Sequence, residues 1–169
     1  EGNLIAGISA PHGRAVSLSG DNNIVAGNLI GVDASGTVAI PNYQGLWIAG
    51  SHNRVGTNGD VDSDDLERNI IDSLEINGSY LDDGAQHNVI AGNYIGVDIG
   101  GTQRLASGAG ILVANNANNN RIGTNANGES DELERNVVAG ALEIRNATGN
   151  MVAGNFFGVG ADGAAERNK

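Results

Sequence analysis

A twelve-residue phrase that occurs three times restricts the fold of this chain more than any other feature. It reads Asn-Asn-Ile-Val-Ala-Gly-Asn-Leu-Ile-Gly-Val-Asp at residues 22–33, and close copies occur at 87–98 and 149–160. Two other phrases recur 67 residues later, from 53 to 120 (Asn-Arg-Val/Ile-Gly-Thr-Asn) and from 66 to 133 (Leu-Glu-Arg-Asn followed by two Ile or two Val). Self-similarity at a fixed period indicates a repeat architecture.

Short segments with apolar residues at alternate positions recur at residues 16–18, 46–48, 74–76, 111–113 and 142–144. Each interval holds three short strands bounded by Gly and Asn, which are typical turn residues. The 27 glycines and the many asparagines disfavour helices. The sequence therefore predicts an all-β parallel β-helix, a solenoid of about five coils with three short strands each and no evident caps. We expect one domain over residues 1–169, as a segment of a longer repeat array.

The repeat also predicts which side chains face the core, because side chains alternate across a strand. In the second strands the expected inward residues are Val25, Val55, Ile90, Ile122 and Val152. In the first strand of the third coil they are Leu74 and Ile76. Two further columns contain only asparagine: Asn23, Asn53, Asn88, Asn120 and Asn150 before the second strands, and Asn3, Asn28, Asn69, Asn93, Asn136 and Asn155 before the third. We expect these side chains to hydrogen-bond from coil to coil.

The phrases Asn-x-Ile-Ala-Gly-Asn-x-Ile-Gly-Val-Asp, Arg-Ile-Gly-Thr-Asn and Glu-Arg-Asn-Val-Val resemble the right-handed parallel β-helix repeats of large bacterial cell-surface and secreted proteins. That fold is shared with pectate-lyase-like carbohydrate enzymes, and the resemblance covers essentially the whole chain. It implies a right-handed coil and an extracellular or cell-surface location. The function it favours is a non-catalytic structural or adhesive segment, with polysaccharide or further copies of the chain as partners. Fold alone does not establish function.

Composition limits the partners and the chemistry. The formal net charge of −11 argues against binding nucleic acid, which needs clustered Lys and Arg. There is no cysteine, so disulfides and thiolate metal sites are excluded. A membrane-spanning run of about 18 apolar residues is also lacking. The first residues carry no signal peptide, so an export signal would have to lie upstream.

An alternative function is carbohydrate binding or carbohydrate chemistry on the outer face of the first strands, where related enzymes have their active sites. Trp47 could stack on a sugar ring beside Glu75, which lies one coil further along. Glycoside hydrolysis needs two carboxylates roughly 5–10 Å apart. No suitable cluster is evident, and we therefore assign no catalytic residue. A third hypothesis is a self-assembling fibre subunit.

Two acidic stretches are candidates for Ca²⁺ binding, although the fold needs no cofactor. Carboxylates at alternate positions resemble the first half of a calcium loop, and the candidate ligands are Asp60, Asp62, Asp64, Asp65, Asn127, Glu129 and Asp131. The alternative is a short turn capped by Asp64 or Asp131, with Glu67 or Glu134 completing a capping box.

Two surface features remain. The outward residues of the third strands form an apolar stripe that is a candidate interface: Leu29, Ile70, Tyr94, Val137 and Phe156. Such a stripe marks either a docking surface or a surface covered by the protein's own loops, here residues 58–66 and 125–132. His52 and His87 occupy one turn column in neighbouring coils, which is consistent either with exposed turns or with a transition-metal pair.

Overall fold

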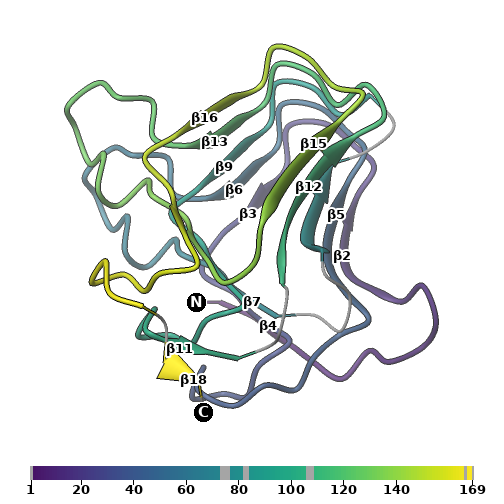
Figure 1. Ribbon diagram of the computed structural model, residues 1–169. Helices are drawn as coiled ribbons and strands as arrows, with labels where there is room; N and C mark the ends of the chain where they lie inside the picture. Colours follow the sequence, from purple (N-terminus) through teal and green to yellow (C-terminus); the bar gives the residue numbers. More distant parts are fainter. Residues whose placement is uncertain (1, 73–76, 82–83, 106–108, 166, 169) are drawn as a thin grey trace.

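The protein is all-β and is built from parallel sheets (Figure 1). A computed structural model describes residues 2–72, 77–81, 84–105, 109–165 and 167–168, and no helix occurs among them. Sheet 1 contains β2 (Arg14–Leu18), β5 (Gln44–Ile48), β8 (Asn77–Leu81), β12 (Gly110–Ala114) and β15 (Leu142–Arg145). Sheet 2 contains β3 (Ile24–Val25), β6 (Arg54–Gly56), β9 (Val89–Ala91), β13 (Arg121–Gly123) and β16 (Met151–Ala153). Sheet 3 contains β1 (Leu4–Ile5), β4 (Leu29–Ile30), β7 (Ile70–Ile71), β10 (Tyr94–Ile95), β14 (Val137–Val138) and β17 (Phe156–Phe157).

Successive strands visit the three sheets in rotation, so the chain forms stacked layers. We define layer 1 as β2, β3 and β4, layer 2 as β5 to β7, layer 3 as β8 to β10, layer 4 as β12 to β14, and layer 5 as β15 to β17. Each strand pairs in parallel with the strands of the same sheet in the layers next to it. This topology is compatible with a β-solenoid. A further parallel pair, β11 (Gln103–Arg104) with β18 (Arg167–Asn168), lies in the loops outside sheet 3.

The predicted inward column of sheet 2 is confirmed. In sheet 2, Val25 pairs with Val55, Val55 with Ile90, Ile90 with Ile122, and Ile122 with Val152. The middle members of this column and of its counterpart in sheet 3 are fully buried in one apolar cluster that runs through the layers. Burying an aliphatic side chain of this size contributes roughly 1.5–3 kcal/mol.

The first strand of layer 3 differs from the prediction. Its strand is β8, in which Ser79 pairs with Leu46 and Leu81 pairs with Ile48, so Leu74 and Ile76 do not occupy those inward positions. Residues 74–76 themselves lie outside the described part of the chain. The physical reason is spacing. Leu81 lies seven positions before Asn88, as Val113 lies before Asn120, and the offset is five or six positions in the other layers, whereas Ile76 lies twelve positions before Asn88. Leu81 is fully buried in the core.

The two asparagine columns form continuous hydrogen-bonded ladders. In the sheet 3 ladder, the side-chain and backbone N–H groups of each asparagine donate to the Oδ1 atom of the asparagine in the next layer, as Asn28 does to Asn69 at 2.9 and 3.0 Å. The same pattern joins Asn93 to Asn136 and, in the sheet 2 ladder, Asn53 to Asn88. Because every rung donates in the same direction, the ladders fix both the register and the polarity of the stack.

Alternate layers differ in the connection between sheets 2 and 3. Layers 1, 3 and 5 use a short glycine turn, centred on Gly27, Gly92 and Gly154. Layers 2 and 4 use what we call the acid loops, residues 57–68 and 124–135. Figure 1 shows the two acid loops side by side, projecting from the same edge of the stack. The two loops are in contact where Gly59 lies against the Glu134 side chain.

Candidate functional site

The outer face of sheet 1 carries Trp47, the candidate sugar-stacking residue. The guanidinium group of Arg14, in the neighbouring strand β2, lies 3.8 Å from the centroid of the Trp47 ring. Arg14 is itself held by a hydrogen bond from its Nε atom to Gln44 Oε1 at 3.3 Å. One face of the indole is therefore occupied by a cation of the protein, which competes with a sugar ring for the same surface.

The partner proposed for Trp47 does not stand beside it in the sheet. The register places Tyr80, not Glu75, next to Trp47 in the adjacent strand. Glu75 lies outside the described residues. The Trp47 indole Nε1 atom is itself buried and has no hydrogen-bond partner among the described residues.

Within each acid loop, one aspartate is turned inward and bound by the loop itself. Asp64 is buried, and its carboxylate accepts hydrogen bonds from the Thr57 hydroxyl and from the N–H groups of Gly59 (3.2 Å) and Val61 (3.1 Å). Asp131 is placed in the same way, bound by the Thr124 hydroxyl and the Gly128 N–H at 3.0 Å. These contacts are the interactions of a carboxylate that closes a turn.

The pKa of the Asp64 carboxyl is lower than its ordinary value of 3.8. Burial is the largest influence and raises the pKa, but it is outweighed by the Ser130 and Thr57 hydroxyls together with the two backbone N–H groups. The ionised form of Asp64 therefore stabilises the folded loop. Ser130 belongs to the acid loop of layer 4, so this carboxylate also lies at the contact between the two loops.

The remaining candidate calcium ligands do not converge on one point. Asp60, Asp62, Asp65, Asn127 and Glu129 are exposed. Asp60 accepts hydrogen bonds from the Asp62 N–H at 2.9 Å and from the Asn58 side chain at 2.7 Å. Within the described ranges, no group of three or more His, Cys, Asp or Glu side chains could hold a metal ion. The loops close in turns, but not through the predicted capping box. Asp64 accepts from the N–H groups of residues that precede it, Gly59 and Val61, and the Glu67 carboxylate accepts the Asn58 N–H at 2.9 Å rather than that of Asp64.

Each acid loop is fastened to sheet 2 by an arginine–glutamate pair. Arg54 contacts Glu67 at 2.6 Å, and Arg121 contacts Glu134 at 2.8 Å. In the second pair the glutamate side chain is fully buried, and it also accepts the Asn125 N–H at 2.8 Å. The recurring Arg-x-Gly-Thr-Asn and Leu-Glu-Arg-Asn phrases are thus the two halves of one anchor.

The apolar stripe of sheet 3 is largely covered by the protein itself. Ile70 and Val137 are buried, while Leu29, Tyr94 and Phe156 are half-buried. The cover over Val137 includes Val97 and Ala161, from the loops that follow β10 and β17. We expected this cover from residues 58–66 and 125–132. Residues of both segments lie beside the stripe, since Asp65 and Leu66 line a pocket with Leu29 and Ile70, and Glu132 lines one with Val137. The loops that follow β10 and β17 and two arginines add to the cover.

The sequence interpretation missed those arginines, Arg68 and Arg135, as part of this surface. The Arg68 guanidinium lies 4.3 Å from the centroid of the Tyr94 ring, and that of Arg135 lies 4.2 Å from the centroid of Phe156. Their Nε atoms donate to the carbonyl oxygens of Gly92 (3.0 Å) and Gly154 (2.7 Å) in the following layer. The signal in the sequence is the arginine before the third-strand asparagine, which occurs only in the layers with acid loops.

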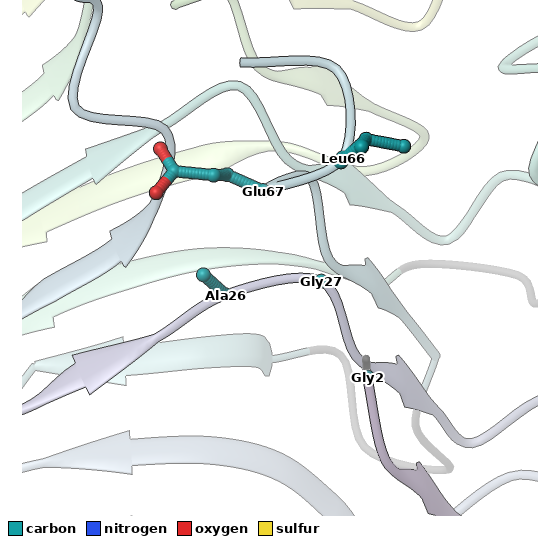
Figure 2. Close-up of a pocket in the computed structure, with 5 residues that line it drawn as sticks. All are labelled: Gly2, Ala26, Gly27, Leu66 and Glu67. Carbon is teal, nitrogen blue, oxygen red and sulfur yellow. The ribbon is translucent and has the colours of Figure 1, made fainter. Parts of the chain in front are cut away.

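A line of three shallow pockets follows the junction between the acid loops and sheet 3. The pocket in Figure 2 has a volume of about 360 Å³ and is lined by Gly2, Ala26, Gly27, Leu66 and Glu67. Figure 2 shows Leu66 and Glu67 on one segment of the loop, with their side chains pointing in opposite directions. A second pocket of about 290 Å³ shares Leu66 and adds Arg68, and a third of about 200 Å³ extends from Arg68 to Arg135. The pocket in Figure 2 offers a ligand one charged side chain, and that carboxylate is bound to Arg54.

The two candidate metal-binding histidines stack on each other at the surface. The ring centroids of His52 and His87 are 5.1 Å apart, with 28° between the ring planes. Both residues have a positive φ, as do Asn22 and Asn119 at the equivalent positions of other layers. The column is therefore one of left-handed turn residues, a conformation that Asn and His adopt more readily than most residues.

No family model, no curated protein and no solved structure matches the chain. Over the part of the chain that is described, no helix has the length and apolar character needed to cross a membrane.

Proposed function

We propose that the protein is a non-catalytic structural segment of an exported bacterial surface protein, folded as a right-handed parallel β-helix of five coils. Each coil corresponds to one layer and adds about 4.8 Å to the length of the stack. Export and surface location rest on the resemblance of the repeat phrases. In this proposal the chain acts as a rigid spacer that holds other parts of a surface assembly at a fixed separation and orientation.

The observation that carries the proposal is that the polar side chains are used to join layers to one another. Asn53, Asn69, Asn88, Asn93, Asn120 and Asn136 are buried within the ladders. The carboxylates of Asp64 and Glu134 close and anchor the acid loops, and Arg14 covers Trp47. Enzymes instead gather titratable groups with perturbed pKa values around an open cavity.

The exposed core of layer 5 also supports a segment that works as part of a stack. Ile144, Val152 and Phe157 are 42%, 38% and 37% exposed. Their counterparts one layer earlier, Val113, Ile122 and Val138, are each fully buried. Stacked repeats bury a continuous core only where a neighbouring layer covers it.

Force spectroscopy on the protein held by its two ends tests the spacer function. We expect no extension until the layers unfold, followed by a gain in contour length approaching about 580 Å, from 169 residues at roughly 3.4 Å each. Steady lengthening at low force would contradict a rigid spacer. Cleavage of a polysaccharide by the purified protein would contradict the non-catalytic function.

Two further measurements separate the alternatives. Polysaccharide binding that is lost in Trp47→Ala would support an adhesive function through the outer face of sheet 1.

For calcium, the melting temperature with Ca²⁺ and with chelator is expected to be the same, because Asp64 and Asp131 are bound by their own loops. A rise with Ca²⁺ that Asp62→Asn abolishes would support the calcium site instead.

A further inference from the structure

We propose that the outer surface of layer 5, the surface turned away from layer 4, is shaped to receive a coil that carries an acid loop. The coil it fits has the pattern of layers 2 and 4, Asn-Arg-Ile-Gly-Thr-Asn followed by a loop and Leu-Glu-Arg-Asn. A coil with a glycine turn does not fit in the same way. This inference deepens the structural function proposed above, and rests on it in treating this surface as a place where coils stack.

The first line of evidence is a hydrogen bond that each glycine turn covered by an acid loop makes to that loop. The Gly27 N–H donates to the Glu67 carbonyl oxygen at 2.9 Å, and the Gly92 N–H donates to that of Glu134 at 2.7 Å. Both acceptors are the last residues but one of an acid loop. Gly154 is the equivalent residue of layer 5, and its N–H has no acceptor among the described residues.

The second line of evidence is the close fit of the acid loop over the glycine. A Cβ atom added to Gly27 would lie 2.8 Å from the Leu66 carbonyl oxygen, and one added to Gly92 would lie 2.6 Å from that of Leu133. Only glycine permits this approach, and φ is +72° and +73° at the two positions. Gly154 repeats the conformation with φ of +70°, and its nearest neighbour is Thr124 of layer 4, so the space above it is open.

The third line of evidence is that the lateral loops stack on loops of their own kind, two layers away. The acid loop of layer 4 lies against that of layer 2, where Gly59 meets Glu134. The loops between sheets 3 and 1 do the same: Ile99 N–H donates to Gly36 O at 2.9 Å, and Ala161 N–H to Gly101 O at 2.8 Å. Layers 1, 3 and 5 carry these loops. The next free position for an acid loop is therefore directly above layer 5.

A second copy of this chain would not satisfy the same surface. Its first strand in sheet 3 is β1, followed by layer 1, and the residues before the ladder asparagines there are Gly2 and Gly27. Neither position carries a returning acid loop whose carbonyl oxygen could reach Gly154. The Gly154 N–H would then be buried without an acceptor, which is unfavourable. The backbone N–H groups of Asn150 and Asn155 also have no acceptor in the described part of the chain, but any layer with an asparagine at the ladder positions supplies one. Gly154 is thus the position that distinguishes the two kinds of coil.

The test appends one coil to the full chain. Residue 169 lies twelve residues after Phe157, as residue 107 lies twelve after Ile95, and Ile95 and Phe157 belong to one column. A copy of residues 108–140 joined after Lys169 therefore continues the spacing with an acid-loop coil. The matched control carries the same copy with its residues 123–135 replaced by Ala-Gly, which recreates the glycine turn of layer 5.

Amide hydrogen exchange measured by NMR gives the result residue by residue. We expect both extensions to slow exchange at Asn150 and Asn155, and only the acid-loop extension to slow Gly154, by at least about tenfold. If both extensions slow exchange at Gly154 equally, or if the acid-loop extension slows exchange at Asn150 and Asn155 but not at Gly154, the inference is wrong. Either result would still be consistent with the proposed structural segment of stacked coils. Concentration-dependent protection of Gly154 in the unextended protein would also overturn it, in favour of a second copy. If neither extension protects Asn150 and Asn155, the surface accepts no coil and the inference fails with them.

Discussion

The buried middle of the asparagine ladder provides the sharpest test of what holds the layers together. Asn93 is fully buried, and its side chain takes part in five hydrogen bonds. The Oδ1 atom accepts from the backbone and side-chain N–H groups of Asn69 at 3.3 and 2.9 Å. The Nδ2 atom donates to Val55 O and Ala91 O at 3.0 Å and to Asn136 Oδ1 at 3.1 Å. Asn93→Ala removes all five and leaves the Asn69 N–H buried without an acceptor.

The expected cost follows from the number of bonds. At roughly 0.5–1.5 kcal/mol net for each hydrogen bond, Asn93→Ala should lower the free energy of unfolding by about 4 kcal/mol. Asn23→Ala, in the exposed first rung of the other ladder, removes two side-chain bonds, to Asp21 O and Asn53 Oδ1, and should cost about 1 kcal/mol. Asn28→Ala removes four and should lie between them.

Urea unfolding followed by the fluorescence of Trp47, the single tryptophan, measures these differences. A loss of about 4 kcal/mol is a large part of the stability of a typical domain, so Asn28→Ala keeps the comparison measurable if Asn93→Ala does not fold. Equal losses for Asn23→Ala and Asn28→Ala, or a loss below about 1 kcal/mol for a folded Asn93→Ala, would refute the reasoning that buried rungs stabilise the stack.

Three further substitutions have matched controls or a defined pH dependence. Gly92→Ala should lower the free energy of unfolding, measured by thermal unfolding, by roughly 3 kcal/mol or more, because the new Cβ would lie 2.6 Å from the Leu133 carbonyl oxygen. Gly128→Ala is the control. Gly128 has a φ of +86° but open space around it, so this loss should be about 1 kcal/mol. Arg121→Ala should lower the free energy of unfolding by roughly 3–5 kcal/mol, because the carboxylate of its partner Glu134 is fully buried. Arg54→Ala is the control and should lower it by about 1 kcal/mol, because its partner Glu67 is partly exposed. Equal losses for the two variants in urea unfolding would contradict this. The pKa of Asp64 is lowered in the folded state, so its ionised carboxylate stabilises the fold above pH 3.8 and this stabilisation is lost as the pH falls through the folded-state pKa. Asp64→Asn should therefore be less stable than the unaltered protein at neutral pH. The difference between the two should vanish in acid.

The stacking of the layers could be predicted from the sequence because a strand's side chains alternate with a period of two and the repeat fixes the phase. Once Val25 and Val55 are assigned to the same position of successive coils, the remaining members of the column follow from the phrase itself. The asparagine ladders follow for the same reason. The prediction that Leu74 and Ile76 supply the inward residues of the first strand in layer 3 was wrong. Two apolar residues at alternate positions fit the strand pattern at several places in the sequence, so the pattern alone does not select the correct pair. The distance to the next ladder asparagine, which is seven residues from Leu81, carries the information that was needed.

The outer surface was less predictable, because it depends on how far long side chains reach and where loops settle. The sequence showed that Arg68 and Arg135 recur in one phrase, but not that each guanidinium crosses to an aromatic ring in the following layer. It showed carboxylates at alternate positions in the acid loops, which suited both a calcium site and a capped turn. The structure has a third arrangement, in which Asp64 turns inward and binds the Thr57 hydroxyl and the N–H groups of Gly59 and Val61, all of which precede it in the chain.

The uniform direction of the asparagine ladders has an electrical consequence. The backbone dipoles of a β-sheet largely cancel, because neighbouring peptide groups point in opposite directions. The side-chain amides of the ladders do not cancel, since each rung from Asn3 to Asn155 donates toward the C-terminal layer. A primary amide has a dipole comparable to that of a peptide unit, roughly 3.5 D. The two columns therefore add a permanent dipole along the axis, positive at layer 5 and negative at layer 1, so the two ends of an otherwise acidic rod differ in the ions they attract.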